Sequence, residues 1–304
     1  MEHSKIAIIG AGAVGSTTAY AIMMRNLTAE IMLVDIDEQR CKGEILDLSD
    51  SIPFSRTAKI TQADAKQAGQ ADIIIIAAGA AQKPGQARTD LFKINQTILS
   101  SIIETIKPIN NNAIIIMISN PVDLLTLHAQ TIAGLPRNQI FGSGTFLDSQ
   151  RLRTLISKKI NISEQSIHAY ILGEHGDTQF AAWSAANIAG VSIDKFSEIT
   201  KNDYNEIAQQ ARNKAYEIIS CKGATFFGIA SCVAAICENI IFDKKRLLPL
   251  SCYQEEFNIC LSMPVILGER GIEQIIPIPL DLEERALLEQ SARVLQKAFK
   301  HDQS

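Results

Sequence analysis

Gly10-Ala11-Gly12-Ala13-Val14-Gly15 is the stretch that decides the fold of this 304-residue chain, because it joins a predicted strand, Lys5–Ile9, to a predicted helix, Ser16–Asn26. The stretch matches the pattern G-x-G-x-x-G. In such a turn the first glycine permits a tight bend, the second lets a phosphate approach the backbone, and the third lets the helix pack closely on the strand. By itself, the hexapeptide is also compatible with an ordinary strand-to-helix turn.

An acidic residue follows the glycine turn at an informative distance. Asp35 ends the next predicted strand, Ile31–Asp35, 20 residues beyond Gly15. Dinucleotide-binding folds place there the carboxylate that accepts hydrogen bonds from the adenine-linked ribose, while the start of the helix holds the phosphates. A carboxylate at this place would repel a 2′-phosphate. The pattern therefore predicts NAD rather than NADP as the cofactor; the alternative for Asp35 is a turn residue at the strand end.

The rest of the first half repeats the alternation of strand and helix. Its apolar runs are uninterrupted, as is typical of parallel strands that are buried on both faces. The predicted strands are Ala58–Thr61, Asp72–Ala78, Ala113–Ser119 and Ile140–Phe141, and the predicted helices are Glu38–Asp47 and Asp90–Ile106. This alternation indicates βαβ units, so we expect an α/β fold with a mostly parallel sheet and helices on both of its faces.

The pattern changes near Gly142–Thr145, and we place a domain boundary there. The second half mixes long helices with strands that no longer alternate regularly with them. The predicted helices are Leu147–Lys159, Ile199–Ile219, Phe226–Phe242 and Asp281–Lys300, and the predicted strands are His168–Leu172, Leu247–Tyr253, Cys260–Leu267 and Ile275–Ile278. We therefore expect a first domain over residues 1–143 and an α+β domain, with an antiparallel sheet, over residues 144–304.

Composition and charge argue against several classes of function. The formal net charge is −4, so the chain offers no basic surface for nucleic acid. Its longest apolar runs are too short to span a membrane, and its first residues lack the pattern of a signal peptide. The six cysteines form no C-x-x-C pair and have no histidine at ligand spacing. We therefore expect reduced thiols, no metal site and a cytoplasmic protein.

Three residues of the second half predict acid–base chemistry on a carboxylate substrate. His175 lies in G-E-H-G-D, residues 173–177, directly after an apolar run, and Asp148 and Arg151 share one face of a predicted helix. A carboxylate on one imidazole nitrogen would set the tautomer and stabilise the imidazolium. An arginine fork would grip a substrate carboxylate with two hydrogen bonds. The alternatives are a solvated loop histidine and a surface ion pair.

Two loops of the first half lie at the edge of the sheet where ligands bind, outside the carboxyl ends of the strands. The glycine- and proline-containing segment 79–88 follows one buried strand and would be a mobile lid that carries Arg88. Ser119-Asn120-Pro121 follows the next buried strand. Arg88 and Asn120 could each equally be structural.

Seven ordered motifs, from about residue 4 to about residue 300, resemble the lactate/malate dehydrogenase family, and most closely its bacterial lactate enzymes. The motifs are G-A-G-A-V-G (10–15), V-D (34–35), A-G-A-A-Q-K-P-G-Q-A-R (78–88), S-N-P-V-D (119–123), G-S-G-T-x-L-D-S-x-R (142–151), G-E-H-G-D (173–177) and K-G-A-T (222–225). The resemblance implies a Rossmann-type, doubly wound parallel sheet followed by an α+β substrate domain.

The resemblance also implies a role for individual residues. His175 would be the acid/base, Asp148 its partner, and Arg151 the ligand of the substrate carboxylate, while Arg88 would polarise the carbonyl from the lid. Asn120 and Thr225 would contact the substrate as well. The residues that would bind NAD are Gly10, Gly12, Val14, Gly15, Asp35, Ala78, Gly79, Ser119 and Asn120.

Gln82, on the predicted lid, bears on the choice of substrate. Lactate enzymes of the family typically carry glutamine six residues before the lid arginine, whereas malate enzymes carry arginine, because a second substrate carboxylate needs a cation once it is desolvated. Lys83 is a neighbouring cation, which we expect to face solvent. The resemblance thus implies reversible reduction of pyruvate to L-lactate by NADH. The alternatives are a malate dehydrogenase, a branched-chain L-2-hydroxy-acid dehydrogenase, or an NAD-binding sensor without catalysis.

Regulation and assembly follow from the resemblance alone. Bacterial lactate dehydrogenases that respond to fructose 1,6-bisphosphate carry an arginine and a histidine at the positions of Arg153 and His168. The resemblance therefore implies an activator site between subunits and a homo-oligomer, most often a tetramer. The alternative for Arg153 and His168 is that both are ordinary interface or surface residues. The alternative to a tetramer is a dimer.

Overall fold

A computed structural model describes residues 5–27, 30–55, 59–81 and 88–300, and at Arg88 only the backbone. The described part of the first half forms parallel strands in the order β6-β5-β4-β1-β2-β3. Their bounds are β1 (Lys5–Ile9), β2 (Glu30–Val34), β3 (Lys59–Gln62), β4 (Ile73–Ile76), β5 (Ile114–Met117) and β6 (Ile140–Gly142). This order is that of a doubly wound dinucleotide-binding fold, which confirms the predicted fold class.

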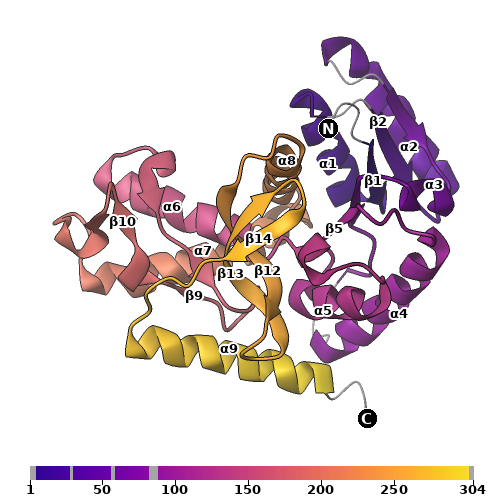
Figure 1. Ribbon diagram of the computed structural model, residues 1–304. Coiled ribbons are helices and arrows are strands. Elements are labelled where there is room, and N and C mark those ends of the chain that lie inside the picture. The colour runs from indigo at the N-terminus through magenta and orange to yellow at the C-terminus, as the bar shows by residue number, and fades with distance from the viewer. Residues whose placement is uncertain (1–4, 28–29, 56–58, 82–87, 301–304) are drawn as a thin grey trace.

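Helices connect these strands and flank the sheet (Figure 1). Their bounds are α1 (Ala13–Met24), α2 (Glu38–Asp50), α3 (Ala65–Gly69), α4 (Arg88–Ile106) and α5 (Val122–Ile132). All four residues of β4, Ile73–Ile76, are buried, because a central parallel strand is covered on both faces. The strand order reverses between β1 and β4, which pair from Ile6 with Ile73 to Ile9 with Ile76. Such a reversal opens a crevice at the carboxyl ends of the strands.

The second half extends the same sheet. The strands β12 (Arg246–Gln254), β13 (Ile259–Gly268) and β14 (Gly271–Ile275) are antiparallel to one another, and β12 joins the parallel part where Ser251 pairs with Gly142. The result is one continuous sheet of nine strands among the described residues. The predicted antiparallel sheet exists, but it is continuous with the parallel sheet of the first half.

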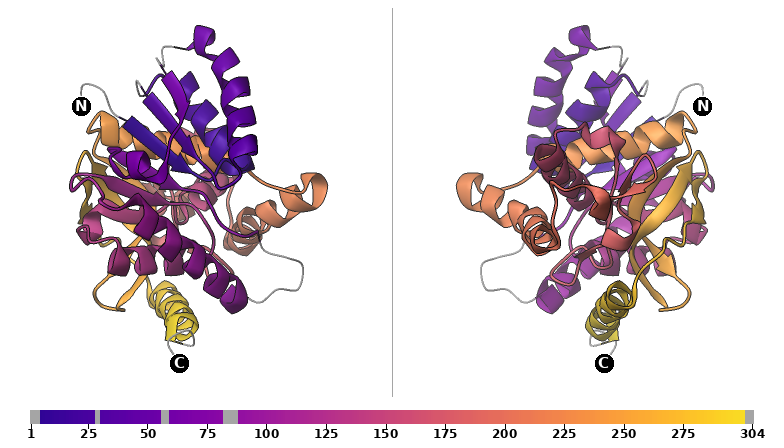
Figure 2. Two further views of the ribbon diagram at one scale, coloured as in Figure 1. Left: turned by 90° about the vertical axis from the view of Figure 1, so that its right-hand side faces the viewer. Right: turned by 90° about the vertical axis from the view of Figure 1, so that its left-hand side faces the viewer.

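The remaining elements form a smaller lobe, seen at the left of Figure 1, and helices that cover the sheet (Figure 2). The helices are α6 (Phe146–Ile160), α7 (Lys201–Lys222), α8 (Phe227–Ile241) and α9 (Leu282–Lys300). The short strands are β7 (Ile167–His168), β8 (Ile171–Leu172), β9 (Phe180–Ala181), β10 (Asn187–Ile188) and β11 (Val191–Ser192). Single 3₁₀ turns lie at Ile52–Phe54, Arg137–Gln139, Glu164–Ser166, Trp183–Ala185 and Ile193–Lys195. No helix in the described ranges is apolar over a length that would cross a membrane.

Several predicted elements differ from the observed ones. The strand predicted at His168–Leu172 is two strands, because β7 pairs with β10 while β8 pairs with β9 in a different sheet. The strand predicted at Ile275–Ile278 is wrong: β14 ends at Ile275, because its register follows from the tight turn that pairs Gly268 with Gly271. Helix α5 was not predicted; most of its residues are buried, including the polar Asp123 and Thr126.

Candidate active site

A cavity of about 260 Å³ lies between the carboxyl edge of the parallel strands and the second half of the chain. Both halves contribute to its walls. The lining residues include Val14, Ile118, Asn120 and Pro121 from the first half and Asp148, Arg151, His175, Gln179, Arg212 and Thr225 from the second. The cavity therefore joins a predicted cofactor residue, Val14, with the predicted acid–base residues.

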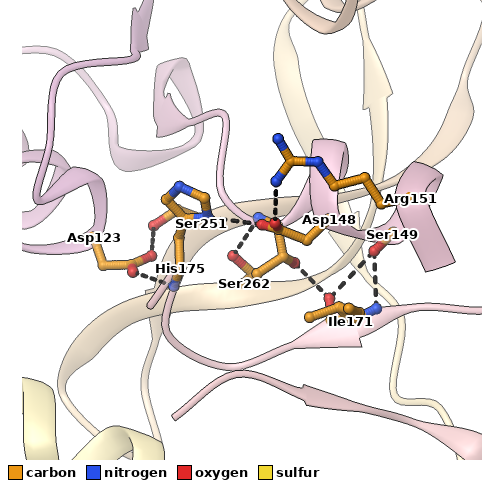
Figure 3. A network of polar contacts seen from close by, with 9 residues as sticks. Asp123, Asp148, Ser149, Arg151, Ile171, His175, Ser251 and Ser262 are labelled. Atoms are coloured by element: carbon orange, nitrogen blue, oxygen red, sulfur yellow. Dashed lines mark hydrogen bonds and ion pairs between the residues drawn. The ribbon is translucent and has the colours of Figure 1, made fainter. Parts of the chain in front are cut away.

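His175, Asp148 and Arg151 form one hydrogen-bonded group in the wall of this cavity (Figure 3). The two Asp148 carboxylate oxygens divide between the other residues: Oδ2 lies 2.8 Å from His175 Nδ1, and Oδ1 accepts a hydrogen bond of 3.1 Å from Arg151 Nη1. Asp148 is 2% exposed and Arg151 is 7% exposed. The alternative of a surface ion pair is therefore wrong, and the spacing on α6 does place both side chains in a cleft.

The charges of this group favour a protonated imidazole. Burial lowers the pKa of His175, but the negative charge of Asp148 and its hydrogen bond raise that pKa by more, so the net shift is upward. Burial raises the pKa of Asp148, but the charges and hydrogen bonds of His175 and Arg151 lower it by more, so that pKa falls. Because Nδ1 faces Asp148, Nε2 is the imidazole nitrogen available to a ligand.

The loop that carries His175 is held from two sides. On one side, the His175 backbone N–H donates to Asp123 Oδ2 at 2.8 Å. On the other, the Glu174 backbone N–H donates to Ser291 Oγ of α9 at 2.6 Å. Gly173 has a φ of +85°, and a Cβ there would lie 2.7 Å from Ser291 Oγ, so the tight approach of α9 requires glycine. The loop is thus fixed at its backbone and directs the imidazole at the cavity.

Asn95 connects the two loops that follow β4 and β5, and the sequence reasoning missed it. Its Nδ2 donates to the Asn120 carbonyl at 2.7 Å, and its Oδ1 accepts from the Ala80 backbone N–H at 2.7 Å. Ser119 Oγ adds a hydrogen bond of 2.6 Å to the Ala78 carbonyl. The only signal in the sequence was an amide at a position that the helix buries, which is costly unless its hydrogen bonds are made.

The glycine turn has the shape that a dinucleotide requires. Gly10 has a φ of +105°, and a Cβ on Gly15 would lie 1.8 Å from the Gly10 carbonyl oxygen, so both positions need glycine. Among the described residues, a Cβ on Gly12 would meet nothing nearer than Arg40 Nη2 at 3.9 Å, which leaves open space above the backbone. Helix α1 begins at Ala13, and no side chain among the described residues caps its start. Its first N–H groups can therefore bind phosphates, and this turn fits NAD.

Asp35 lies beside the glycine turn, one residue beyond the end of β2. Its Oδ2 accepts the Ala11 backbone N–H at 2.6 Å, and its Oδ1 accepts the Asp37 backbone N–H at 2.9 Å. These two bonds set the plane of the carboxylate and leave further lone pairs for ribose hydroxyls. The position agrees with a role as the ribose ligand.

The remaining predicted site residues fall into three groups: those at or near the cavity, those outside the described residues, and those away from the cavity. Asn120 and Thr225 line the cavity, and Ala78 and Gly79 follow β4 next to Gly10 and Asn95. Gln82 lies outside the described residues, and so does the side chain of Arg88. Arg153 and His168 do not line the cavity. Arg153 Nε donates to the Ala169 carbonyl at 3.0 Å, and its guanidinium lies 5.0 Å from the Tyr170 ring centre.

Comparisons with known proteins agree with this geometry. Residues 4–142 match the family model of the lactate/malate dehydrogenase NAD binding domain, and residues 145–304 match that of the lactate/malate dehydrogenase alpha/beta C-terminal domain. L-lactate dehydrogenase A of Rhizopus oryzae is 46% identical over 293 residues, which cover 96% of this chain and 91% of that protein. L-lactate dehydrogenase of Lacticaseibacillus casei is 41% identical over 306 residues, covering 98% and 94%.

Solved structures of lactate dehydrogenases are similar to this chain over nearly its whole length. A lactate dehydrogenase from a Medee basin deep-sea metagenome library has a TM-score of 0.95 and 35% sequence identity, and the match covers 100% of both chains. The minor L-lactate dehydrogenase of Enterococcus mundtii has a TM-score of 0.95 and 33% identity, and the match covers 99% of both chains.

Proposed function

Because this chain belongs to the lactate/malate dehydrogenase family, we propose that it catalyses the reversible transfer of hydride between NADH and pyruvate, giving L-lactate. The observation that supports this most strongly is the Asp148–His175 pair. Its Nδ1 to Oδ2 distance is 2.8 Å, and it shares a cavity with the buried fork of Arg151. A proton donor and a carboxylate ligand are the two groups that reduction of a 2-keto acid asks of the protein.

The residues that would hold NAD lie in the first half. The first N–H groups of α1, at Gly12 and the residues after it, would bind the pyrophosphate, and Asp35 would bind the adenine-linked ribose. Val14, Ala78, Gly79, Ser119 and Asn120 would border the cofactor toward the cavity. When bound, the nicotinamide supplies or accepts the hydride. We also propose that residues 1–143 and 144–304 act as the cofactor-binding and substrate-binding units.

The chain's own residues would then handle the substrate and the proton. Arg151 holds the substrate carboxylate with its guanidinium, which fixes the ketone next to His175. His175 donates the proton on Nε2 to the ketone oxygen during reduction and takes it back during oxidation, while Asp148 stabilises the imidazolium. Arg88, the first residue of α4 and the end of the predicted lid, would polarise the ketone as negative charge builds on its oxygen. Thr225 and Asn120 would complete the contacts around the substrate.

Substrate preference is the first experiment for this proposal. We expect kcat/KM with NADH to be at least about 100-fold higher for pyruvate than for oxaloacetate, because Gln82 offers no cation for a second carboxylate. Gln82→Arg should raise kcat/KM for oxaloacetate and lower it for pyruvate. Steady-state oxidation of NADH, followed by its absorbance, measures both.

Three results would contradict this assignment. A preference for oxaloacetate in the unmodified protein would favour a malate dehydrogenase, with Lys83 as a candidate cation. A preference for branched 2-keto acids would favour a branched-chain L-2-hydroxy-acid dehydrogenase. Binding of NADH without turnover of any keto acid would favour a sensor on the same fold.

A finer proposal concerns regulation by fructose 1,6-bisphosphate in a homotetramer. Arg153 is partly buried. Burial, and to a smaller extent the positive charge of Arg246, lowers the pKa of Arg153. His168 is exposed on β7. Doubling these cations across a two-fold axis would form a phosphate site. We expect fructose 1,6-bisphosphate to lower KM for pyruvate, and Arg153→Gln to abolish that response. An unchanged response in the variant, or a monomer by light scattering, would contradict the proposal.

The proposed location is the cytoplasm. All six cysteines are free thiols, and five of them are buried, which suits a reducing compartment.

A further inference from the structure

Asp123 is a buried carboxylate next to the catalytic histidine, and the mechanism above does not use it. It lies in the first turn of α5 and is 2% exposed. It is also the last residue of the S-N-P-V-D stretch, so it connects the Asn120 loop to the rest of the site. A buried carboxylate is costly unless its charge serves to bind its neighbours.

Both oxygens of Asp123 have a partner from a different part of the chain (Figure 3). Oδ2 accepts the His175 backbone N–H at 2.8 Å, and Oδ1 accepts the Ser251 hydroxyl at 2.6 Å. Ser251 belongs to β12, is fully buried, and pairs with Gly142 of β6. Asp123 therefore ties the His175 loop to the sheet and to α5 at the same time.

The charged groups around His175 come from several elements. Asp148 of α6 contacts both Arg151 and the His175 imidazole. Asp123 of α5 adds a second negative charge, which also raises the pKa of His175. Burial is the largest influence on Asp123, and it raises the pKa. The hydrogen bonds from Ser251 and His175 favour the charged form, and the negative charge of Glu174 opposes it. The net pKa of Asp123 is about 6. The thiol of Cys252 on β12 also lies in the field of Asp123.

We propose that Asp123 is a positioning residue for His175: its ionised carboxylate holds the His175 backbone and, together with Asp148, stabilises the imidazolium that pyruvate reduction requires. The two carboxylates divide the task. Asp148 orients the ring through Nδ1, and Asp123 fixes the main chain from which the ring projects. This inference rests on the proposed role of His175 as the proton donor.

The decisive variant is Asp123→Asn, because asparagine has the same shape, removes the charge and can still pair with both partners, with the direction of the Ser251 bond reversed. Its amide oxygen can accept the His175 N–H, and its amide nitrogen can donate to Ser251 Oγ. We expect the pH at which His175 titrates to move downward. The pH midpoint of kcat/KM for pyruvate should move with it, so that kcat/KM above the wild-type midpoint falls about three- to tenfold. Imidazole NMR of the free protein, assigned with a His175 variant, measures the titration without turnover.

Ser291→Ala is the matched control. It removes the hydrogen-bond acceptor of Glu174, the neighbour of His175 in the same loop, without a change of charge. It should lower stability and leave the midpoint unchanged. Ser251→Ala is the second variant in case Asp123→Asn does not fold. It removes the donor that favours the charged form of Asp123, so the midpoint should move in the same direction by a smaller amount.

Two outcomes would overturn the inference. If the Asp123→Asn protein kept the wild-type pH midpoint, Asp123 would have only a structural role. A shift of the same size in Ser291→Ala would assign the effect to loop displacement instead of charge. Failure of the proposed function is distinguishable, because the NMR midpoint could still shift in a protein that turns over no pyruvate.

Discussion

His175→Gln is expected to lower kcat for pyruvate reduction by about 10²- to 10⁴-fold, the range that a positioned general acid contributes. Glutamine is close in size, and its amide can still donate to Asp148 Oδ2, so Asp148 keeps a partner for its buried charge. The affinity for NADH should stay near that of the wild type, because the glycine turn at residues 10–15 does not involve the His175 loop. Stopped-flow kinetics and NADH fluorescence titration measure the two quantities.

The same prediction fixes the direction of the pH dependence. Reduction needs the protonated imidazole, whereas oxidation of lactate needs the neutral one. Since Asp148 raises the pKa of His175 above its ordinary value of 6.5, kcat/KM for pyruvate should stay high at pH 6.5 and fall as pH rises through that higher pKa. The lactate reaction should gain activity over the same range. A His175→Gln enzyme that keeps wild-type kcat with the same profile would remove His175 from the mechanism.

Arg151→Lys is expected to lower kcat/KM for pyruvate by about 30- to 4,000-fold, mainly through KM. The lysine keeps the positive charge but loses the planar fork that binds a carboxylate with two parallel hydrogen bonds. Truncation of one partner of a buried, hydrogen-bonded charge pair costs about 2 to 5 kcal/mol, and each 1.4 kcal/mol is about tenfold in affinity. Because Arg151 is 7% exposed and contacts Asp148, no bulk water replaces the lost bond.

The control for this variant is Lys158→Gln, on the exposed side of the same helix α6. It should leave KM for pyruvate unchanged, and both variants should leave KM for NADH unchanged. An Arg151→Lys protein with wild-type KM for pyruvate would show that another cation binds the carboxylate. Arg212, which lines the same cavity, would then be the next candidate.

Much of the fold was predictable from local patterns. The bounds predicted for Lys5–Ile9 agree with β1, and most helices agree within a few residues, because their apolar spacing repeats over several turns. The errors fall where contacts with distant parts of the chain determine an element. β14 takes its bounds from the hairpin with β13, and most of helix α5 is buried by other parts of the protein, its polar Asp123 and Thr126 included. The local pattern of a segment carries no record of such neighbours.

The candidate site divides in the same way. The sequence alone identified His175, Asp148, Arg151 and the glycine turn, because each belongs to a short motif whose spacing reflects a local requirement: a helical i, i+3 pair or a turn that only glycine can make. The tertiary structure alone revealed Asp123, Asn95, Ser251 and Ser291, whose partners lie far away in the chain. Their roles come from burial, which makes every unpaired polar group costly and thereby selects the partners that fold around the site.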